Sequence, residues 1–168
     1  MNLGVMTDYH LDLQERLGCG SLIDALEARF NSYLEQKRYE SRGDALAALR
    51  QIKLFLHEEK QFRLEALKSS KIGGTDCLTL STITALLADR LGHPVFVTAP
   101  RTFARMLHAN VEYFDDGERK TFSVAGRRRF TNVRRLSPTE VAVRLTLSRR
   151  LVQTGATVAG RLGLRRSR

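Results

Sequence analysis

The stretch GGTDCLTLSTITALLADRLGHPVF, residues 73–96, decides the fold of this chain. Two glycines precede Cys77, and apolar residues then recur at helical spacing as far as Gly92. A glycine just after the last apolar position is a typical helix end, and a short polar residue just before the first one is a typical helix start. The pattern therefore predicts a helix that has Thr75 or Asp76 as its cap, carries Cys77 in its first turn, and ends at Gly92.

The place of Cys77 in the first turn of that helix gives its thiol two interpretations. Unpaired amides and the positive end of the helix dipole stabilise a thiolate there, so we expect a lowered thiol pKa and a good nucleophile. Alternatively, Cys77 is a small apolar residue in the core. Cys19, the other cysteine, has no acid or base beside it in LGCG, and we interpret it as structural.

After residue 94 the apolar period changes from helical to alternating. The segment PVFVTAP, residues 94–100, predicts a short buried strand, and RMLHANVEYF, residues 105–114, alternates apolar and polar positions. The sequence DDG then separates this run from ERKTFSVAG, residues 118–126. An Asp-Gly pair between two alternating runs predicts a β-hairpin whose two-residue turn is Asp116 and Gly117.

The register of this hairpin places a candidate site on one face of the sheet. With a two-residue turn, Asp115 pairs with Glu118, and counting back places Asn110 opposite Ser123. His108 then lies on the same face as Asn110 and Ser123. A nucleophilic cysteine needs a base such as His108, and a third group must orient the imidazole. We therefore expect Cys77, His108, Ser123 and Asn110 to form a catalytic site.

The remainder of the chain divides into a helical beginning and a basic end. Residues 1–70 read as helices, with starts expected at Ser21 and Ser41. Residues 71–136 form the core with the cysteine and the histidine, and residues 137–168 form an Arg-rich helical extension that starts at the motif SPTE. We expect one domain, since 168 residues bury a single substantial core.

The basic residues are concentrated at the C-terminus. Twelve arginines and one acid follow residue 126, whereas the preceding residues hold sixteen basic and seventeen acidic side chains. Arginine favours planar anions, so nucleic acid, an anionic membrane surface or an acidic partner chain is a possible ligand, and simple solubility is the alternative. The candidate polyanion-binding residues are Arg127, Arg128, Arg129, Arg134, Arg135, Arg149, Arg150, Arg165 and Arg166.

Several classes of protein are disfavoured by composition. Two cysteines make no disulfide framework, and no apolar run is long enough to cross a membrane. The first residues lack the apolar stretch of a signal peptide, so we expect a cytoplasmic protein. No metal-ligand spacing, phosphate-binding loop or dinucleotide motif occurs, and we expect no cofactor.

The order of these motifs resembles the core of the transglutaminase-like superfamily over about residues 41–126. That core has a cysteine at the start of a central helix, a Gly-x-Pro turn, and a strand that begins with a His-Ala-Trp-Val-Glu-like motif. The positions that match are Cys77, Gly92, Pro94, His108, Ala109, Val111 and Glu112. The resemblance implies a papain-like α+β fold, with N-terminal helices and the cysteine-bearing helix packed on an antiparallel sheet.

The function implied by the resemblance is that of a cysteine hydrolase or acyltransferase. Such an enzyme would act on an amide or peptide through a thioester at Cys77, with His108 as base. Asn110 stands where the family has an aromatic residue, and Ser123 stands where it has the catalytic Asp. This departure supports the alternative, a non-catalytic binding module of the same fold whose Arg-rich end contacts a polyanion.

Overall fold

The computed structural model describes residues 3–37, 44–59, 76–100, 108–126 and 132–147, and among these the side chains from residue 8 onward. The helices are α1 (Leu3–Leu17), α2 (Gly20–Lys37), α3 (Ala45–Glu58) and α5 (Cys77–Arg90), and a further helix occupies 138–147. The strands are β1 (Phe96–Pro100), β2 (Asn110–Asp115), β3 (Glu118–Phe122) and β4 (Val133–Arg135). They form one antiparallel sheet in the order β3-β2-β1-β4. The expected α+β class is therefore confirmed.

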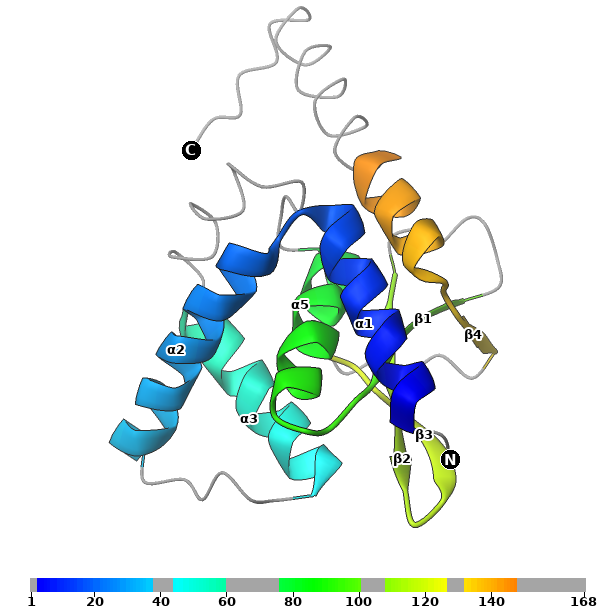
Figure 1. The fold of residues 1–168 in the computed structure, drawn as a ribbon. Coiled ribbons are helices and arrows are strands. Elements are labelled where there is room, and N and C mark those ends of the chain that lie inside the picture. Colours follow the sequence, from blue (N-terminus) through cyan, green and yellow to red (C-terminus); the bar gives the residue numbers. More distant parts are fainter. Residues whose placement is uncertain (1–2, 38–43, 60–75, 101–107, 127–131, 148–168) are drawn as a thin grey trace, which may run out of the picture.

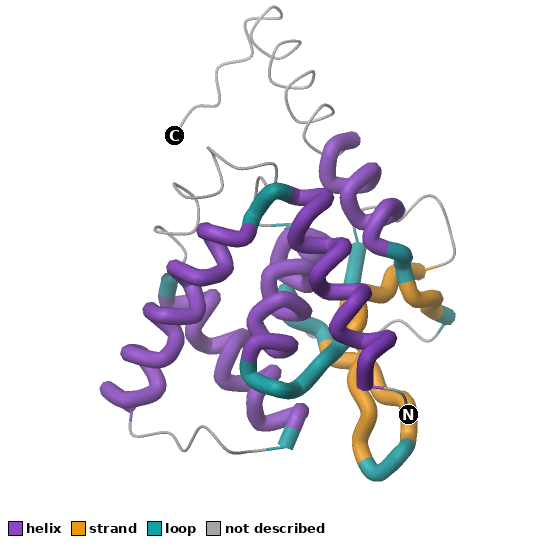
Figure 2. The backbone as a smooth tube through the Cα atoms, viewed as in Figure 1, coloured by secondary structure: helices purple, strands orange, loops and turns teal. Residues whose placement is uncertain are grey.

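Helix α5 lies at the centre of the molecule, between the other helices and the sheet (Figure 1). Every residue from Leu78 to Ala88 is buried, so this helix has no solvent-facing stripe. A helix that is buried on all sides must be covered by several elements, and α5 packs against α1, α2, α3, β1 and β2. Figure 2 shows helices α1, α2, α3 and α5 grouped to one side of the strands.

Both ends of α5 follow the sequence prediction. The Asp76 side chain accepts a hydrogen bond from the Thr79 amide at 2.9 Å and so caps the first turn. At the other end Gly92 has a φ of +80°, and the His93 amide donates to the Ala88 carbonyl at 2.9 Å. These bonds form a Schellman motif, which requires the left-handed conformation that glycine adopts without strain.

The predicted hairpin is confirmed with its register. Asp116 and Gly117 have φ values of +50° and +79°, as a two-residue turn of type I′ requires. Asp115 pairs with Glu118, and Val111 pairs with Phe122 at the other end of the ladder. The strand predicted over 94–100 is also present as β1, which pairs with β2 on its other side.

Two expected helix starts differ from the structure. Helix α2 begins at Gly20, one residue before the expected cap Ser21, because Gly18 with a φ of +57° ends α1 and turns the chain directly into α2. The expected start at Ser41 lies outside the described residues, and α3 is capped by Asp44, whose side chain accepts from the Ala47 amide.

The start of the C-terminal extension is confirmed as a capping box. The Glu140 amide donates to the Ser137 hydroxyl at 3.2 Å, and the Ser137 amide donates to the Glu140 carboxylate at 3.0 Å. This reciprocal pair starts the helix at 138–147.

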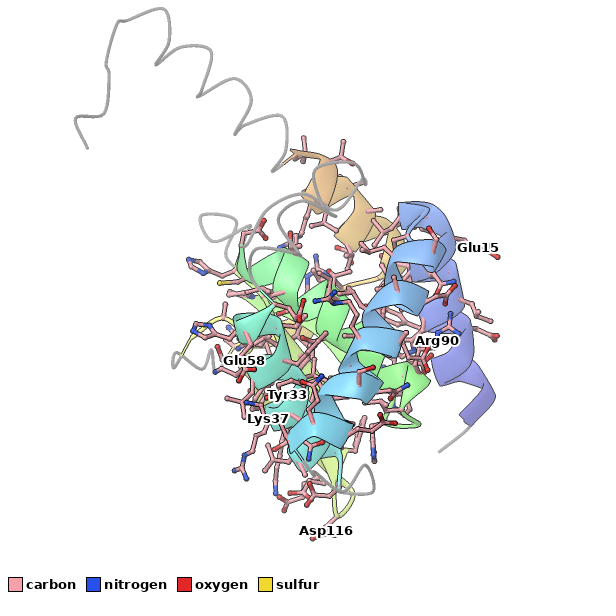
Figure 3. The ribbon with its side chains drawn as sticks, turned by 90° about the vertical axis from the view of Figure 1, so that its left-hand side faces the viewer. Glu15, Tyr33, Lys37, Glu58, Arg90 and Asp116 are labelled. Atoms are coloured by element: carbon pink, nitrogen blue, oxygen red, sulfur yellow. The ribbon has the colours of Figure 1, made fainter. Side chains whose placement is uncertain are left out.

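Salt bridges and ring contacts join α2 to α3 on the surface. The Lys37 ammonium lies 3.5 Å from the Glu58 carboxylate and 5.6 Å from the centre of the Tyr33 ring. Figure 3 shows these three side chains together at one end of the two helices.

Within the described ranges, no helix has the length and hydropathy needed to cross a membrane.

Candidate functional site

The structure brings Cys77 and His108 together. The Sγ atom of Cys77 lies 3.9 Å from the Nδ1 atom of His108, within the distance of a thiol–imidazole hydrogen bond. Cys77 is the first residue of α5 and is half-buried, whereas the His108 side chain is exposed. The Cys77 thiol is therefore partly covered by protein, whereas the His108 imidazole lies at the surface.

The positions of these two residues follow from where their elements begin. Helix α5 begins at Cys77, and β2 begins at Asn110, two residues after His108. The hairpin turn with Asp116 lies at the other end of the molecule from the start of α5 (Figures 1 and 3). Because a strand rises about 3.3 Å per residue, Asp115 lies roughly 16 Å from Asn110 along β2. The acids of the turn are thus too far away to orient His108.

The expected lowering of the Cys77 thiol pKa is wrong. Burial raises the pKa of this thiol, and the nearby Asp76 carboxylate raises it further. The backbone amides of Cys77 and Ala109 act in the opposite direction, since both favour the thiolate. The start of α5 does supply backbone amide donors. However, the residue that caps them is Asp76, whose negative charge lies next to Cys77 and disfavours a thiolate.

Asn110 is buried without hydrogen-bond partners for its side chain. It is 1% exposed, and within the described part of the chain neither its amide oxygen nor its amide nitrogen has a hydrogen-bond partner. Asn110 therefore does not hydrogen-bond to His108 in this structure. Its backbone is well held, because the Asn110 carbonyl accepts from the Thr98 hydroxyl at 3.3 Å.

Ser123 lies just beyond the end of β3 and is held through its backbone. The Lys53 ammonium on α3 donates to the Ser123 carbonyl at 3.0 Å and to the Gly126 carbonyl at 3.3 Å. The same ammonium lies 5.5 Å from the centre of the Phe122 ring. Lys53 thus connects α3 to the segment that carries Ser123, one of the expected site residues.

The alternating pattern of β2 did not reveal that its polar face is buried too. Glu112 is fully buried, although the pattern placed it with the polar positions. Its carboxylate forms ion pairs with Arg119 on β3 and Arg135 on β4. The Arg135 guanidinium also stacks on the Phe96 ring, 3.4 Å from its centre. Arg119 and Arg135 therefore neutralise a buried carboxylate on an inner strand of the sheet.

His10 is a buried residue that sequence reasoning missed. It is 2% exposed, its Nε2 atom lies 2.7 Å from the Val95 carbonyl, and its Nδ1 atom lies 3.2 Å from the Asp89 carboxylate. Burial raises the pKa of Asp89, while His10 and Arg90 oppose that shift. His10 lies three residues before Leu13, which lies four before Leu17, and all three are buried. This helical spacing is the signal that could have predicted the burial of His10.

Two of the nine candidate polyanion-binding arginines are described. Arg134 forms an ion pair with Glu140, and Arg135 forms one with Glu112. Both guanidinium groups thus bind carboxylates of the chain itself. The remaining seven, at 127–129, 149–150 and 165–166, lie outside the described residues.

Cys19, which we interpret from the sequence as structural, is buried in the core with Leu17 and Ile23. Burial raises the pKa of its thiol to about 11. Within the ranges that the structure describes, no group of three or more His, Cys, Asp and Glu side chains is placed to hold a metal ion.

Comparisons with known proteins give no relative for this chain: no family model, no curated protein and no solved structure matches it.

Proposed function

We propose that this chain is a cysteine hydrolase or acyltransferase of transglutaminase-like type, with a papain-like fold, that acts on an amide or peptide bond. The observation that supports it is the 3.9 Å distance between Cys77 Sγ and His108 Nδ1 at the start of a buried helix. A thiol, a base in contact with it and backbone amides at a helix start are the groups that acyl transfer requires.

The proposed reaction has two steps. The Cys77 sulfur attacks the carbonyl carbon while His108 takes the thiol proton, and the amides of the first turn of α5 stabilise the developing oxyanion. The amide C–N bond then breaks, and His108 returns the proton to the leaving amine. Water or a second amine attacks the thioester, with His108 as base, and the acyl product leaves Cys77 as a thiol.

The surroundings of the sulfur favour the protonated thiol at rest. Burial and the Asp76 carboxylate raise the pKa of the Cys77 thiol, so the thiol, more than the thiolate, is the resting form of Cys77. Proton transfer to His108 then accompanies attack on the substrate. In this arrangement the base, more than a preformed thiolate, makes the sulfur nucleophilic at neutral pH.

Ser123 and Asn110 are the residues proposed to orient His108, and Asn110 must turn toward the ring to do so, because it makes no hydrogen bond to it in this structure. Nδ1 faces Cys77, so a group that orients the ring would contact Nε2. Asn110 starts β2 two residues after His108, and its buried amide has no hydrogen-bond partner among the described residues. A neutral amide holds the ring direction but stabilises an imidazolium less than a carboxylate does.

The test is the acetylation of Cys77 by p-nitrophenyl acetate, which carries no side chain and so reports the reactivity of the thiol alone. We expect the wild-type protein to become acetylated at Cys77, located by mass spectrometry, and to release p-nitrophenolate in a burst. His108→Ala should slow this step at neutral pH about 100-fold or more, the usual effect of losing a general base. Cys77→Ser should remove the burst.

The matched control is His93→Ala, because His93 lies at the opposite end of α5 from the thiol. It should leave the rate unchanged. If wild-type and His108→Ala proteins react equally, at the rate of an ordinary thiol, the enzyme proposal is wrong. The chain is then a binding module of the same fold, and titration of a polyanion such as heparin at rising salt tests the Arg-rich end.

A further inference from the structure

A pocket of about 300 Å³ lies between α3, α5 and the segment that follows β3. Its walls are mainly apolar, with Leu54 and Leu56 from α3, Leu80 from α5, and Val124 and Ala125 from the segment after β3. Ligand pockets in proteins are usually of at least this size and mostly apolar, with a few polar groups at defined places. The question is what such a pocket would hold here.

Two of the walls connect the pocket to the candidate site. Leu80 follows Cys77 by three residues on α5, so the two side chains are neighbours on one helix face, with about 5–6 Å between their Cβ atoms. On the sheet side, β3 ends opposite Val111, and residues 124–125 continue the chain toward the end of β2 where His108 lies. Cys77 and His108 do not line the pocket themselves, but a group that contacts Leu80 lies about one helical turn from the thiol along α5.

The size of the pocket indicates the size of its ligand. A cavity of about 150 Å³ lined by apolar side chains binds benzene. This pocket has about 300 Å³, so it has room for a leucine or phenylalanine side chain. An alanine or glycine would leave most of the apolar wall without contact.

The two charged or titratable residues of the pocket are Lys53 and His57, and no acid lines it. Two of the three Lys53 donors bind the Ser123 and Gly126 carbonyls. No carboxylate in the described part of the chain forms an ion pair with Lys53, so its positive charge is available to an anion. This charge favours a ligand with a carboxylate beside its apolar group.

We propose that the pocket binds a leucine- or phenylalanine-sized side chain of the acyl donor, with an acidic residue next to it that pairs with Lys53. This inference rests on the proposed function, since it places the carbonyl of that peptide at Cys77. It narrows the substrate class to peptides that carry a bulky apolar residue at the attacked carbonyl and an acidic neighbour.

The first experiment compares p-nitrophenyl esters of acetyl-glycine, acetyl-leucine and acetyl-glutamyl-leucine in the full chain. Burying a leucine side chain should raise the second-order rate of Cys77 acylation about tenfold or more over the glycine ester. The glutamyl ester should react faster still than its acetyl-glutaminyl-leucine counterpart, and added salt should reduce that difference. Equal rates for the glycine and leucine esters would overturn the proposal.

The variants separate the two parts of the pocket. Ala125 is exposed, so Ala125→Phe should fill the pocket without disturbing the core and remove most of the preference for leucine. Lys53→Met should remove the preference for glutamate over glutamine but keep the preference for leucine over glycine. The matched control is Val143→Phe, an exposed position on the helix at 138–147, which should change neither preference. Circular dichroism checks that each variant is folded.

A second measurement does not depend on the reactivity of the thiol. Methyl groups of Leu80 and Val124 are followed by NMR while acetyl-glutamyl-leucine amide is added to the Cys77→Ser protein. Saturable shifts that disappear in Cys77→Ser combined with Ala125→Phe support the pocket even if p-nitrophenyl acetate shows no role for His108. Conversely, a His108-dependent thiol with no leucine preference and no methyl shifts leaves the enzyme proposal standing and overturns this one.

Discussion

The Sγ atom of Cys77 lies 3.9 Å from the Nδ1 atom of His108, although 31 residues separate them in the chain. Cys77 begins a helix and His108 lies two residues before a strand, and both elements start at the same end of the molecule. The contact therefore depends on how α5 packs on β2. Four properties of the surrounding structure lead to testable expectations.

Asp76 has two effects at the start of α5, and one substitution separates them. Its carboxylate caps the helix and raises the pKa of the Cys77 thiol. Asp76→Asn keeps a good cap, so the free energy of unfolding should change by less than about 0.5 kcal/mol. Because the negative charge is lost, the thiol pKa should fall and iodoacetamide should alkylate Cys77 faster at neutral pH.

Asp76→Ala is the comparison variant. It removes the charge and the cap together, so it should lower the thiol pKa and also destabilise the protein by about 1 kcal/mol in urea unfolding. If Asp76→Asn leaves the pH dependence of alkylation unchanged, the Asp76 carboxylate does not raise the pKa of the Cys77 thiol.

We expect the loss of each arginine partner of Glu112 to destabilise the protein by a different amount. Arg135→Met removes an ion pair to a fully buried carboxylate and a stack on Phe96, so it should destabilise the protein by about 2–3 kcal/mol. Arg119→Met removes only the ion pair of a more exposed guanidinium and should cost about 1 kcal/mol. Urea unfolding of both variants measures this order, and a larger loss for Arg119→Met would contradict it.

The capping box at Ser137 predicts a loss of stability in acid. Hydrogen bonds from Arg134 and then from the Ser137 amide lower the pKa of Glu140 from 4.5 to about 2. Because the folded-state pKa is depressed, this stabilisation is present above pH 4.5 and is lost as the pH falls toward about 2. The amount should be at most about 1 kcal/mol, since water screens a largely exposed pair.

The measurement compares wild type with Glu140→Gln by urea unfolding at several pH values. The wild-type protein should be the more stable one near neutral pH, and the difference should shrink steadily in acid. A difference that stays constant over that range would mean that the Glu140 carboxylate does not contribute through its charge.

His10 should be important for the attachment of α1. His10→Leu leaves the Val95 carbonyl and the buried side of Asp89 without the ring nitrogens that now face them. Loss of partners for buried polar groups should destabilise the protein by about 2–3 kcal/mol. The adjacent Leu11 is 52% exposed, and Leu11→Gln should change the stability by less than about 0.5 kcal/mol in the same unfolding assay.

The elements with local signals were predicted well. The limits of α5, the two-residue turn at Asp116 and Gly117, and the capping box at Ser137 depend on neighbours within a few residues. Such signals are present in the sequence because the backbone bonds that they satisfy are local. Helix α2 starts two residues earlier than a cap at Ser21 would place it, since the turn at Gly18 precedes the expected cap.

The environment of the site was predicted less well. Alternation along β2 separates two faces, but it does not tell what covers each face. Glu112 and Asn110 are buried because β2 is an inner strand of the sheet and its polar face is covered as well. Burial of Cys77 itself, together with the Asp76 carboxylate, reverses the expected pKa shift of its thiol.

By itself, the sequence determined where α5 ends, where the hairpin turns, and that Cys77 lies in the first turn of a helix. It placed His108 inside a strand, whereas β2 begins two residues later, at Asn110. Only the tertiary structure decided that the two side chains touch, that Arg135 binds Glu112, and that Asn110 is enclosed. The physical reason is range. Caps and turns are set by bonds between neighbours, whereas contact, burial and thiol pKa depend on side chains brought together by packing.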